Sequence, residues 1–157
     1  MNVEYRLMHP GEEDAVCRLI EDSFNEFVAP DYSNVGVKEF FKYANPQSLK
    51  DRAQKNHFVF VASASDADKL AGVIEIRENN HVSLLFVKTE YQNLGIAKKL
   101  LELSLERCRK ANPSLDHIDV NSSPYAVKIY ERLGFKTIGM QQEVNGIRFT
   151  PMKLLIK

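Results

Sequence analysis

Residues 81–99 read HVSLLFVKTEYQNLGIAKK, and this stretch decides the fold that the sequence predicts. Residues 81–87 are mostly apolar, which favours a strand. From Gly95 to Ala111 apolar residues recur at helical spacing, and Asn112-Pro113 ends that pattern. A strand therefore runs through a short loop into a helix. The first backbone N–H groups of a helix have no partner within it, so a glycine at its start predicts a place where an anion can approach.

Three lysines lie close to that helix start in the sequence, namely Lys88, Lys98 and Lys99. Cationic side chains beside free N–H groups favour a phosphate or diphosphate. The alternative is that Gly95 only begins the helix and that the lysines are solvated. The dinucleotide-binding and P-loop signatures are both absent from the sequence, so this spacing alone does not decide between the two interpretations.

Apolar runs before this helix predict neighbouring antiparallel strands over 57–64, 70–77 and 81–87. Turns are expected at Asp66-Ala67-Asp68 and at Asn79-Asn80. If the second turn contains only the two asparagines, Glu75 lies opposite Leu84 and their side chains share one face of the sheet.

Helical patterns fill the region before residue 57. Glu12-Glu13-Asp14 places acidic residues where the helix dipole favours them, and Ala29-Pro30-Asp31 should end that helix. Shorter helices are expected around residues 37–41 and from Pro46 to about Gln54, the latter capped by Asn45. The first helix has one apolar face, formed by Val16, Leu19, Ile20, Phe24 and Phe27.

After the long helix the chain continues with a strand and a further helix. Residues 115–121 predict the strand, and residues 124–133 predict a helix that Gly134 closes at its carboxyl cap. The antiparallel middle and this strand–helix–strand order together favour helices packed on a mixed sheet. The sequence therefore predicts an α/β fold.

The last part of the chain predicts a hairpin. Asn145-Gly146 is a strong hairpin signal and would join strands over 135–144 and 147–156. Pro151 in the second strand indicates a sheet edge or a bulge. An exposed edge here could pair with a second copy of the chain, which would give a homodimer.

Composition narrows the class of protein without naming a function. The chain has 157 residues, with 21 basic and 21 acidic side chains, which suits one domain over residues 1–157. Zero formal charge argues against nucleic-acid binding. No apolar run approaches a membrane span and the amino terminus lacks a signal-peptide core, so we expect a cytoplasmic protein that binds no membrane. Two cysteines are too few for a disulfide framework or a cysteine-built metal site, and we expect no metal.

Two segments resemble the motifs of the GNAT acetyltransferase superfamily. Residues 92–97, QNLGIA, resemble its Gln/Arg-x-x-Gly-x-Gly/Ala signature, with Ala97 where glycine is more frequent, and they follow a strand ending in Phe86-Val87. Residues 121–135, NSSPYAVKIYERLGF, resemble its second motif, which runs from an asparagine through an alanine and a tyrosine to Gly-Phe. The resemblance extends from about Leu70 to the end. It implies a GNAT-like acyl-CoA N-acyltransferase fold, with a mixed, mostly antiparallel central sheet flanked by helices.

The resemblance also implies acetyl-CoA as the co-substrate. In this family, backbone groups of the strand before the loop pair with the pantetheine arm, and the matching residues are Leu85, Phe86 and Val87. The diphosphate would lie on the loop and the helix start, which match Gln92, Asn93, Leu94, Gly95, Ile96 and Ala97, with Lys98 and Lys99 beside them. Asn121 and Lys128 match positions that often touch the coenzyme.

Acetyl transfer from a thioester to an amine needs a proton donor for the thiolate and a proton acceptor for the amine. Tyr130 matches the general-acid tyrosine of the family, although its place on an apolar helix face would also suit a core aromatic. Glu75 is the first candidate for the base, because residues 81–87 contain no carboxylate. The alternative for Glu75 is a solvated side chain paired with Arg77. His81 is the second candidate, and a water relay is equally allowed.

In this superfamily the acceptor enters opposite the coenzyme, across a groove bordered by the first helices and the last hairpin. Aromatic residues gather in the corresponding amino-terminal segment, and we take Phe27 and Tyr32 as candidates for acceptor contact. Glu143, near the hairpin turn, is the candidate that would meet a cationic amine. A core position for the aromatics and a solvated turn for Glu143 are the alternatives. The acceptor is expected to be a small-molecule or peptide amine.

The resemblance thus implies an enzyme, an N-acetyltransferase that moves an acetyl group to a primary amine by direct attack in a ternary complex. Cys17 and Cys108 fall on core-facing helix positions, which argues against a covalent acyl-enzyme. The alternative is a non-catalytic acyl-CoA-binding sensor with the same fold, which the lack of a carboxylate in residues 81–87 slightly favours.

Overall fold

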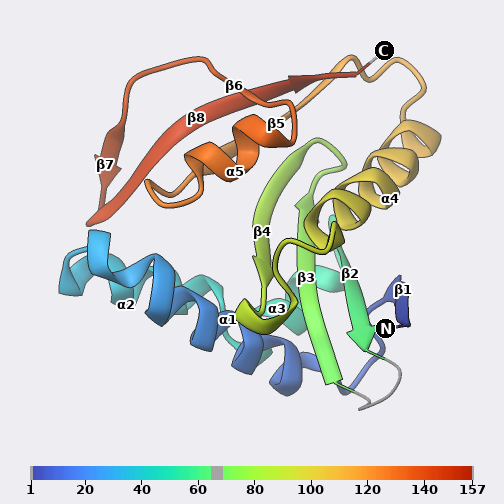
Figure 1. Cartoon of the computed structure of the whole chain (residues 1–157), viewed down its shortest axis with the longest axis horizontal. Coiled ribbons are helices and arrows are strands. Elements are labelled where there is room, and N and C mark those ends of the chain that lie inside the picture. The colour runs from blue at the N-terminus through green and yellow to red at the C-terminus, as the bar shows by residue number, and fades with distance from the viewer. Residues whose placement is uncertain (1, 65–68, 157) are drawn as a thin grey trace.

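The computed structural model describes residues 2–64 and 69–156, and these form an eight-stranded sheet with helices on both faces (Figure 1). The strands are β1 (Val3–Leu7), β2 (His57–Ala64), β3 (Lys69–Arg77), β4 (His81–Val87), β5 (His117–Ser122), β6 (Lys136–Thr137), β7 (Gln142–Val144) and β8 (Ile147–Leu155). The helices are α1 (Glu13–Phe27), α2 (Asn34–Tyr43), α3 (Pro46–Ala53), α4 (Ile96–Ala111) and α5 (Val127–Arg132), with short 3-10 turns η1 (Ala29–Asp31) and η2 (Thr89–Tyr91).

The sheet is mixed and mostly antiparallel, which confirms the predicted fold class. Its strand order is β1-β2-β3-β4-β5-β8-β6, and β7 pairs with β8 beyond β6. Only the β4–β5 pair is parallel among the described strands. The turn predicted at Asp66-Ala67-Asp68 lies outside the described residues.

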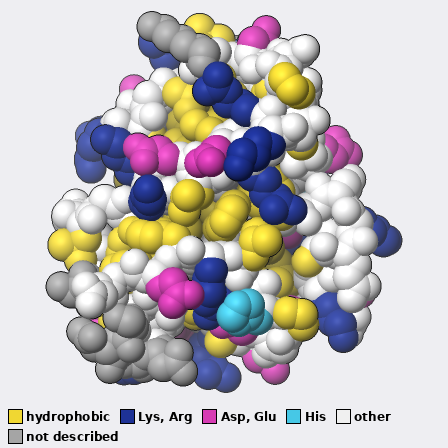
Figure 2. All heavy atoms as spheres, turned by 90° about the vertical axis from the view of Figure 1, so that its right-hand side faces the viewer, with side chains coloured by type: hydrophobic (Ala, Val, Ile, Leu, Met, Phe, Trp, Pro, Cys, Tyr) yellow, Lys and Arg dark blue, Asp and Glu magenta, His cyan; other side chains and the backbone are white. Residues whose placement is uncertain are grey.

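Successive residues of the central strands point to opposite faces, and each face has its own core. One core lies under α1 and α3 and contains Val16, Ile20, Leu49, Val59, Val61 and Val73. The other lies under α4 and contains Phe58, Ile74, Ile76, Leu100, Ile118 and Met152. On the side of the molecule that carries α4 and β1, a band of hydrophobic side chains remains visible between charged ones (Figure 2).

The amino-terminal helices follow the predicted signals closely. Asn45 caps α3, and its side-chain oxygen accepts a hydrogen bond from the Ser48 N–H at 3.0 Å. Ala29-Pro30-Asp31 does end α1, but these residues form the 3-10 turn η1 instead of an open loop. None of the helices in residues 2–64 and 69–156 has the length and apolar character needed to cross a bilayer.

The β3–β4 hairpin confirms the predicted pairing of Glu75 with Leu84, but its turn is longer than predicted and a bulge compensates for the difference. Arg77 pairs with His81, so three residues form the turn instead of two. Two of these, Glu78 and Asn79, have positive φ angles of 53° and 57°. A bulge in β4 then shifts the register by one residue and restores the Glu75–Leu84 pair.

The carboxy-terminal hairpin differs from its prediction in its first arm. Instead of one strand over 135–144, two short strands, β6 and β7, pair with β8 on either side of Pro151. The expected edge position of Pro151 is wrong, because β8 lies between β5 and β6. Proline has no N–H to donate, and the pairing partner of β8 is interrupted beside it, where only the Ile138 N–H reaches the Pro151 oxygen.

The strands β4 and β5 separate soon after they meet. They pair only at His81–Asp119 and Val82–Val120. Beyond these pairs, the β5-facing edge of β4 from Ser83 onward has no strand partner among the described residues. This separation creates the space in which the candidate site lies.

Candidate active site

A cavity of about 860 Å³ lies between the diverging strands. One wall, which we call the α4 side, consists of β4 residues 83–87 and the loop and helix start at residues 91–93 and 95–98. The opposite wall, the α2 side, consists of Tyr32 and of side chains from α1 and α2, including Tyr43 at the end of α2. Residues 120–133 of β5 and α5 border both walls. The volume suits a sizeable ligand or two smaller ones.

The α4 side presents mainly backbone groups to the cavity. The edge of β4 has no strand partner along Ser83–Val87, so its N–H and C=O groups before the Val87 carbonyl can bond to an extended ligand. The loop that follows is fixed to this strand, because the Gln92 side-chain amide donates to the Val87 carbonyl at 3.1 Å. An extended chain laid against β4 would therefore end at the start of α4.

The start of α4 is open to an anion. Its cap residue Gly95 has a φ of 81°, a left-handed conformation that favours glycine, and Asn93 before it has a φ of 63°. No side chain caps the helix and no acidic residue lies in its first turn. A Cβ built at Gly95 would meet nothing within 4 Å, so the approach is clear. These features fit a phosphate or diphosphate group.

Most residues that the sequence predicted for coenzyme binding line this cavity. They are Leu85, Phe86, Val87, Gln92, Asn93, Gly95, Ile96, Ala97, Lys98, Asn121 and Lys128. Two others, Leu94 and Lys99, do not line it, and the Leu94 side chain is 55% exposed. The fold thus brings residues 85–98 together with Asn121 and Lys128, which follow α4 in the chain.

Tyr130 lies at the border of the two walls. Its ring is buried against Phe135 with a centroid separation of 5.2 Å, and the residue lines the cavity. Burial raises the pKa of the Tyr130 hydroxyl well above its ordinary value, so the group keeps its proton. The core interpretation of Tyr130 is therefore confirmed, and the residue also lines the cavity, while its role as general acid stays a prediction.

Glu75 is fully buried and does not line the cavity. Its carboxylate accepts two hydrogen bonds from Arg52, at 2.9 Å from Nε and 3.2 Å from Nη2. The Ser83 hydroxyl donates to the same carboxylate at 2.8 Å. The alternative in which Glu75 is solvated and paired with Arg77 is therefore wrong, since its partner is Arg52 of α3.

His81, the second candidate for the base, is buried beside Asp119 and hydrogen-bonds to it through Nδ1. Burial lowers the pKa of the imidazole, while the hydrogen bond to Asp119 opposes that shift. His81 does not line the cavity. Neither candidate for the base therefore has direct access to a ligand.

The α2 side is aromatic, and both aromatic candidates for acceptor contact line it. Phe27 stacks on Tyr125 with a centroid separation of 4.8 Å, and Tyr32 packs edge-on against Phe24 at 5.5 Å. Glu143 does not line the cavity. It is exposed on the hairpin and pairs with Arg148 at 3.3 Å, which agrees with a solvated turn.

Several lining residues were not identified from the sequence. Ser83 is a polar residue within an apolar strand, and Glu39 is one of several charged residues near the amino terminus. No sequence pattern indicates that either one faces a cavity. Glu39 is the one carboxylate among the described residues that line the cavity, and it pairs with Lys42 at 2.8 Å. Tyr43 is one of several aromatic residues in the amino-terminal segment, and the sequence does not distinguish it from the others. A periodic pattern identifies a buried face but not which polar residue faces a cavity.

The two cysteines lie in the cores and away from the cavity lining. Burial raises the pKa of both the Cys17 and the Cys108 thiol to about 11. At neutral pH both groups are therefore protonated and poor nucleophiles. This agrees with a chemistry that has no covalent acyl-enzyme. No cluster of three or more metal-ligating side chains occurs in the described part of the chain.

Comparison with known proteins places these features in a family. The acetyltransferase (GNAT) domain family matches residues 28–156. An uncharacterised N-acetyltransferase of Escherichia coli strain K12, YafP, is 23% identical over 150 residues, which covers 95% of this chain and 92% of YafP.

Solved structures agree in fold. A GCN5-related N-acetyltransferase from Rhodopseudomonas palustris superposes with a TM-score of 0.81 at 16% identity, covering 99% of this chain and 97% of that one. The PaiA N-acetyltransferase from Thermoplasma acidophilum, solved in complex with coenzyme A, superposes with a TM-score of 0.79 at 20% identity, covering 99% and 100% of the two chains.

Proposed function

The chain belongs to the GNAT acetyltransferase family, and from this premise we propose that it is an N-acetyltransferase that moves an acetyl group from acetyl-CoA to a primary amine. The observation that carries the proposal is that one cavity has a backbone-lined wall able to hold an extended, phosphorylated ligand and, facing it, an aromatic wall. Two different ligands can therefore meet in one space. A ternary complex with direct attack needs that arrangement.

The α4 side would hold the coenzyme. Its uncapped helix start with Gly95 and the nearby Lys98 suits the diphosphate, and the free edge of β4 suits the pantetheine arm. When bound, acetyl-CoA supplies an activated acetyl group as a thioester. Because the arm would extend along β4 away from Gly95, the thioester would lie near Ser83 and Leu84, where the strands part.

Tyr130 would serve as the proton donor to the leaving thiolate. It lines the cavity, so its hydroxyl can reach a ligand bound there. Because its pKa is raised by burial, it holds a proton at any physiological pH. A protonated phenol in a partly desolvated site can stabilise developing negative charge on sulfur.

The acceptor would lie on the α2 side. Phe27, Tyr32 and Tyr43 can pack against its carbon skeleton, and the Glu39 carboxylate can attract its ammonium group. The cations Lys98, Lys128 and Arg132 also line the cavity, Lys98 on the α4 side and the other two on α5. These charges favour an anionic coenzyme beside the cations and a cationic amine beside Glu39.

The proposal is tested by measuring release of free CoA thiol from acetyl-CoA with a panel of primary amines, alongside calorimetry of acetyl-CoA binding. We expect binding and turnover with at least one amine. Acetyl-CoA binding without turnover on any amine would support a non-catalytic acyl-CoA sensor instead. Failure to bind acetyl-CoA at all would contradict both functions.

A further inference from the structure

Two buried side-chain atoms have no hydrogen-bond partner within residues 2–64 and 69–156, and they occur side by side. They are the hydroxyl oxygen of Tyr43 and Nε2 of His57. The two rings have a centroid separation of 6.5 Å. Buried polar atoms without partners are rare, because each one forfeits its bonds to water. Two such atoms in one place call for a common explanation.

The hydrogen bonds of the neighbouring residues fix which atom of His57 carries its proton. The Asn56 amide nitrogen donates to Glu78 at 3.2 Å, which turns the Asn56 amide oxygen toward His57. This oxygen can only accept, so His57 Nδ1 donates to it across 2.7 Å. Nε2 of His57 therefore carries a lone pair. It is a buried acceptor that lacks a donor.

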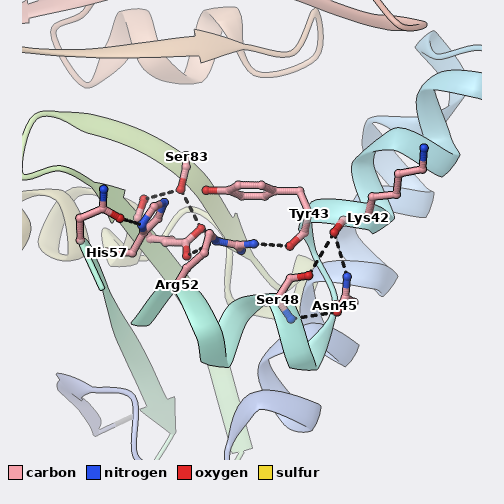
Figure 3. Close-up of polar contacts among 9 residues, drawn as sticks. Lys42, Tyr43, Asn45, Ser48, Arg52, His57 and Ser83 are labelled. Carbon is pink, nitrogen blue, oxygen red and sulfur yellow. Dashed lines mark hydrogen bonds and ion pairs between the residues drawn. The ribbon is translucent and has the colours of Figure 1, made fainter. Parts of the chain in front are cut away.

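Tyr43 supplies the complementary donor. Arg52 stacks over its ring at 3.5 Å, which fixes its orientation, and Figure 3 shows its hydroxyl pointing toward Ser83. Burial raises the pKa of this hydroxyl to about 12, so the group keeps its hydrogen. Ser83 and Glu75 lie near enough to influence that pKa, yet no bond of normal geometry forms. The Tyr43 hydroxyl is therefore a buried donor that lacks an acceptor.

Ser83 connects this pair with the cavity. It lines the cavity at the bulge of β4, and its hydroxyl lies in the same cluster as Tyr43 and His57 (Figure 3). At the other end the cluster reaches the surface, because Asn56 and Glu78 beside His57 are exposed. Neighbouring polar side chains thus lie between the cavity and solvent, with unpartnered atoms at Tyr43 and His57.

We propose that Ser83, Tyr43 and His57, with one buried water between Tyr43 and His57, carry the proton of the acceptor ammonium out of the cavity. The ammonium N–H bond breaks and its proton passes to the Ser83 oxygen, whose own hydrogen leaves its bond to Glu75 and passes to the Tyr43 oxygen. The Tyr43 proton passes to the water, and a water proton passes to Nε2. Each oxygen gains one proton and loses one, so the net change is ammonium to amine and imidazole to imidazolium.

The surroundings of His57 suit a neutral acceptor. Burial lowers the pKa of the imidazole, Glu75 and Glu78 act to raise it, and Arg52 and Arg77 act to lower it. His57 is therefore uncharged at neutral pH and able to accept a proton. Glu75, by contrast, has both carboxylate oxygens engaged by Arg52 and Ser83, which favours a structural role in holding the cluster.

This inference rests on the proposed acetyltransferase function, and its test compares His57→Gln with the unaltered enzyme over pH 5.5–9. Glutamine preserves polarity and size but does not titrate in this range. We expect kcat at pH 7 to fall by about 100-fold. We also expect the acidic limb of the kcat profile, which in the unaltered enzyme follows protonation of His57, to disappear. His117→Gln, which changes an exposed histidine outside the cavity, should leave both the rate and the profile unchanged.

Tyr43→Phe provides a second and milder variant, because it removes only the hydroxyl and retains the ring under Arg52. We expect a similar loss of kcat with unchanged acetyl-CoA affinity. If the groups act in series, the double variant should be no slower than the slower single variant. A His57→Gln enzyme that retains its rate and acidic limb, or losses that multiply in the double variant, would overturn the relay. If the unaltered chain turns over no amine, the proposed function fails instead.

Discussion

The two walls of the cavity are built on different principles. The α4 side is made of backbone: an unpaired strand edge, an uncapped helix start and a left-handed glycine at Gly95. The α2 side is made of side chains, mostly aromatic rings, and one of them, Tyr43, stacks on the buried ion pair between Arg52 and Glu75 behind the wall. Backbone groups can bind any extended phosphorylated ligand, whereas side chains set shape and charge. Under the proposed function, the α4 side would bind the coenzyme and the α2 side would select the acceptor.

The two walls also differ in what keeps them in place. The α4 side is held by local contacts, such as the Gln92 amide on the Val87 carbonyl. The α2 side depends on contacts between distant segments. A Cβ on Gly36 would lie 2.0 Å from the Gly146 oxygen, so α2 and the carboxy-terminal hairpin touch backbone to backbone. We therefore expect substitutions on the α2 side to affect folding more than equivalent ones on the α4 side.

The largest expected effect is on stability, from Arg52→Met. The substitution removes both hydrogen bonds to the Glu75 carboxylate and the stacking on Tyr43, and it leaves a fully buried charge without its cation. The free energy of unfolding should fall by about 3–5 kcal/mol, as measured by urea denaturation. Lys50→Met, at an exposed position of the same helix, should change it by less than about 0.5 kcal/mol.

The double variant Arg52→Met with Glu75→Met distinguishes the lost ion pair from lost packing. Replacing a buried pair by apolar side chains is often neutral, so the double variant should recover most of the stability. A double variant as unstable as Arg52→Met alone would mean that the Arg52 contacts to Tyr43 and not its charge support the α2 side.

The next effect concerns Tyr130, which lies where the two walls meet. Tyr130→Phe removes the proposed proton donor and retains the ring that packs on Phe135. We expect kcat to fall by about 100-fold, with acetyl-CoA affinity unchanged within about twofold. Steady-state kinetics and calorimetry measure the two quantities. Tyr5→Phe, in β1 and outside the cavity, serves as the control, and equal activity of the two variants would remove Tyr130 from the mechanism.

The difference between the walls also explains which parts of the site could be predicted from the sequence alone. The strand, loop and helix of the α4 side are adjacent in the chain and carry one motif, and the family resemblance of that motif implied the fold and most of the residues that line that wall. The pair formed by Arg52 and Glu75 joins residues 23 positions apart in different elements, and no local pattern indicates which cation meets which carboxylate. The bulge in β4 was invisible for the same reason, since the pairing of Glu75 with Leu84 satisfies a two-residue turn equally well.

Gly95→Ala tests whether the α4 side depends on backbone conformation. A side chain in the left-handed region costs about 1–2 kcal/mol, so the loop should relax and turn its N–H groups away. We expect acetyl-CoA affinity to fall about tenfold by calorimetry. Gly11→Ala is a matched control, because Gly11 also has a positive φ, of 96°, and also has no atom within 4 Å of a built Cβ. Both variants should lose similar stability, and only Gly95→Ala should lose affinity.

The smallest effect is expected at Glu39, where two substitutions should change KM for the amine in opposite directions. Glu39 is partly exposed and already pairs with Lys42 at 2.8 Å, so its attraction for an ammonium group is worth only about 1 kcal/mol. Glu39→Gln should therefore raise KM for a cationic amine about fivefold without changing KM for acetyl-CoA. Lys42→Gln frees the same carboxylate from its competitor, so KM for the amine should fall. Two variants that shift KM in the same direction would show that Glu39 acts through the shape of the α2 side and not through its charge.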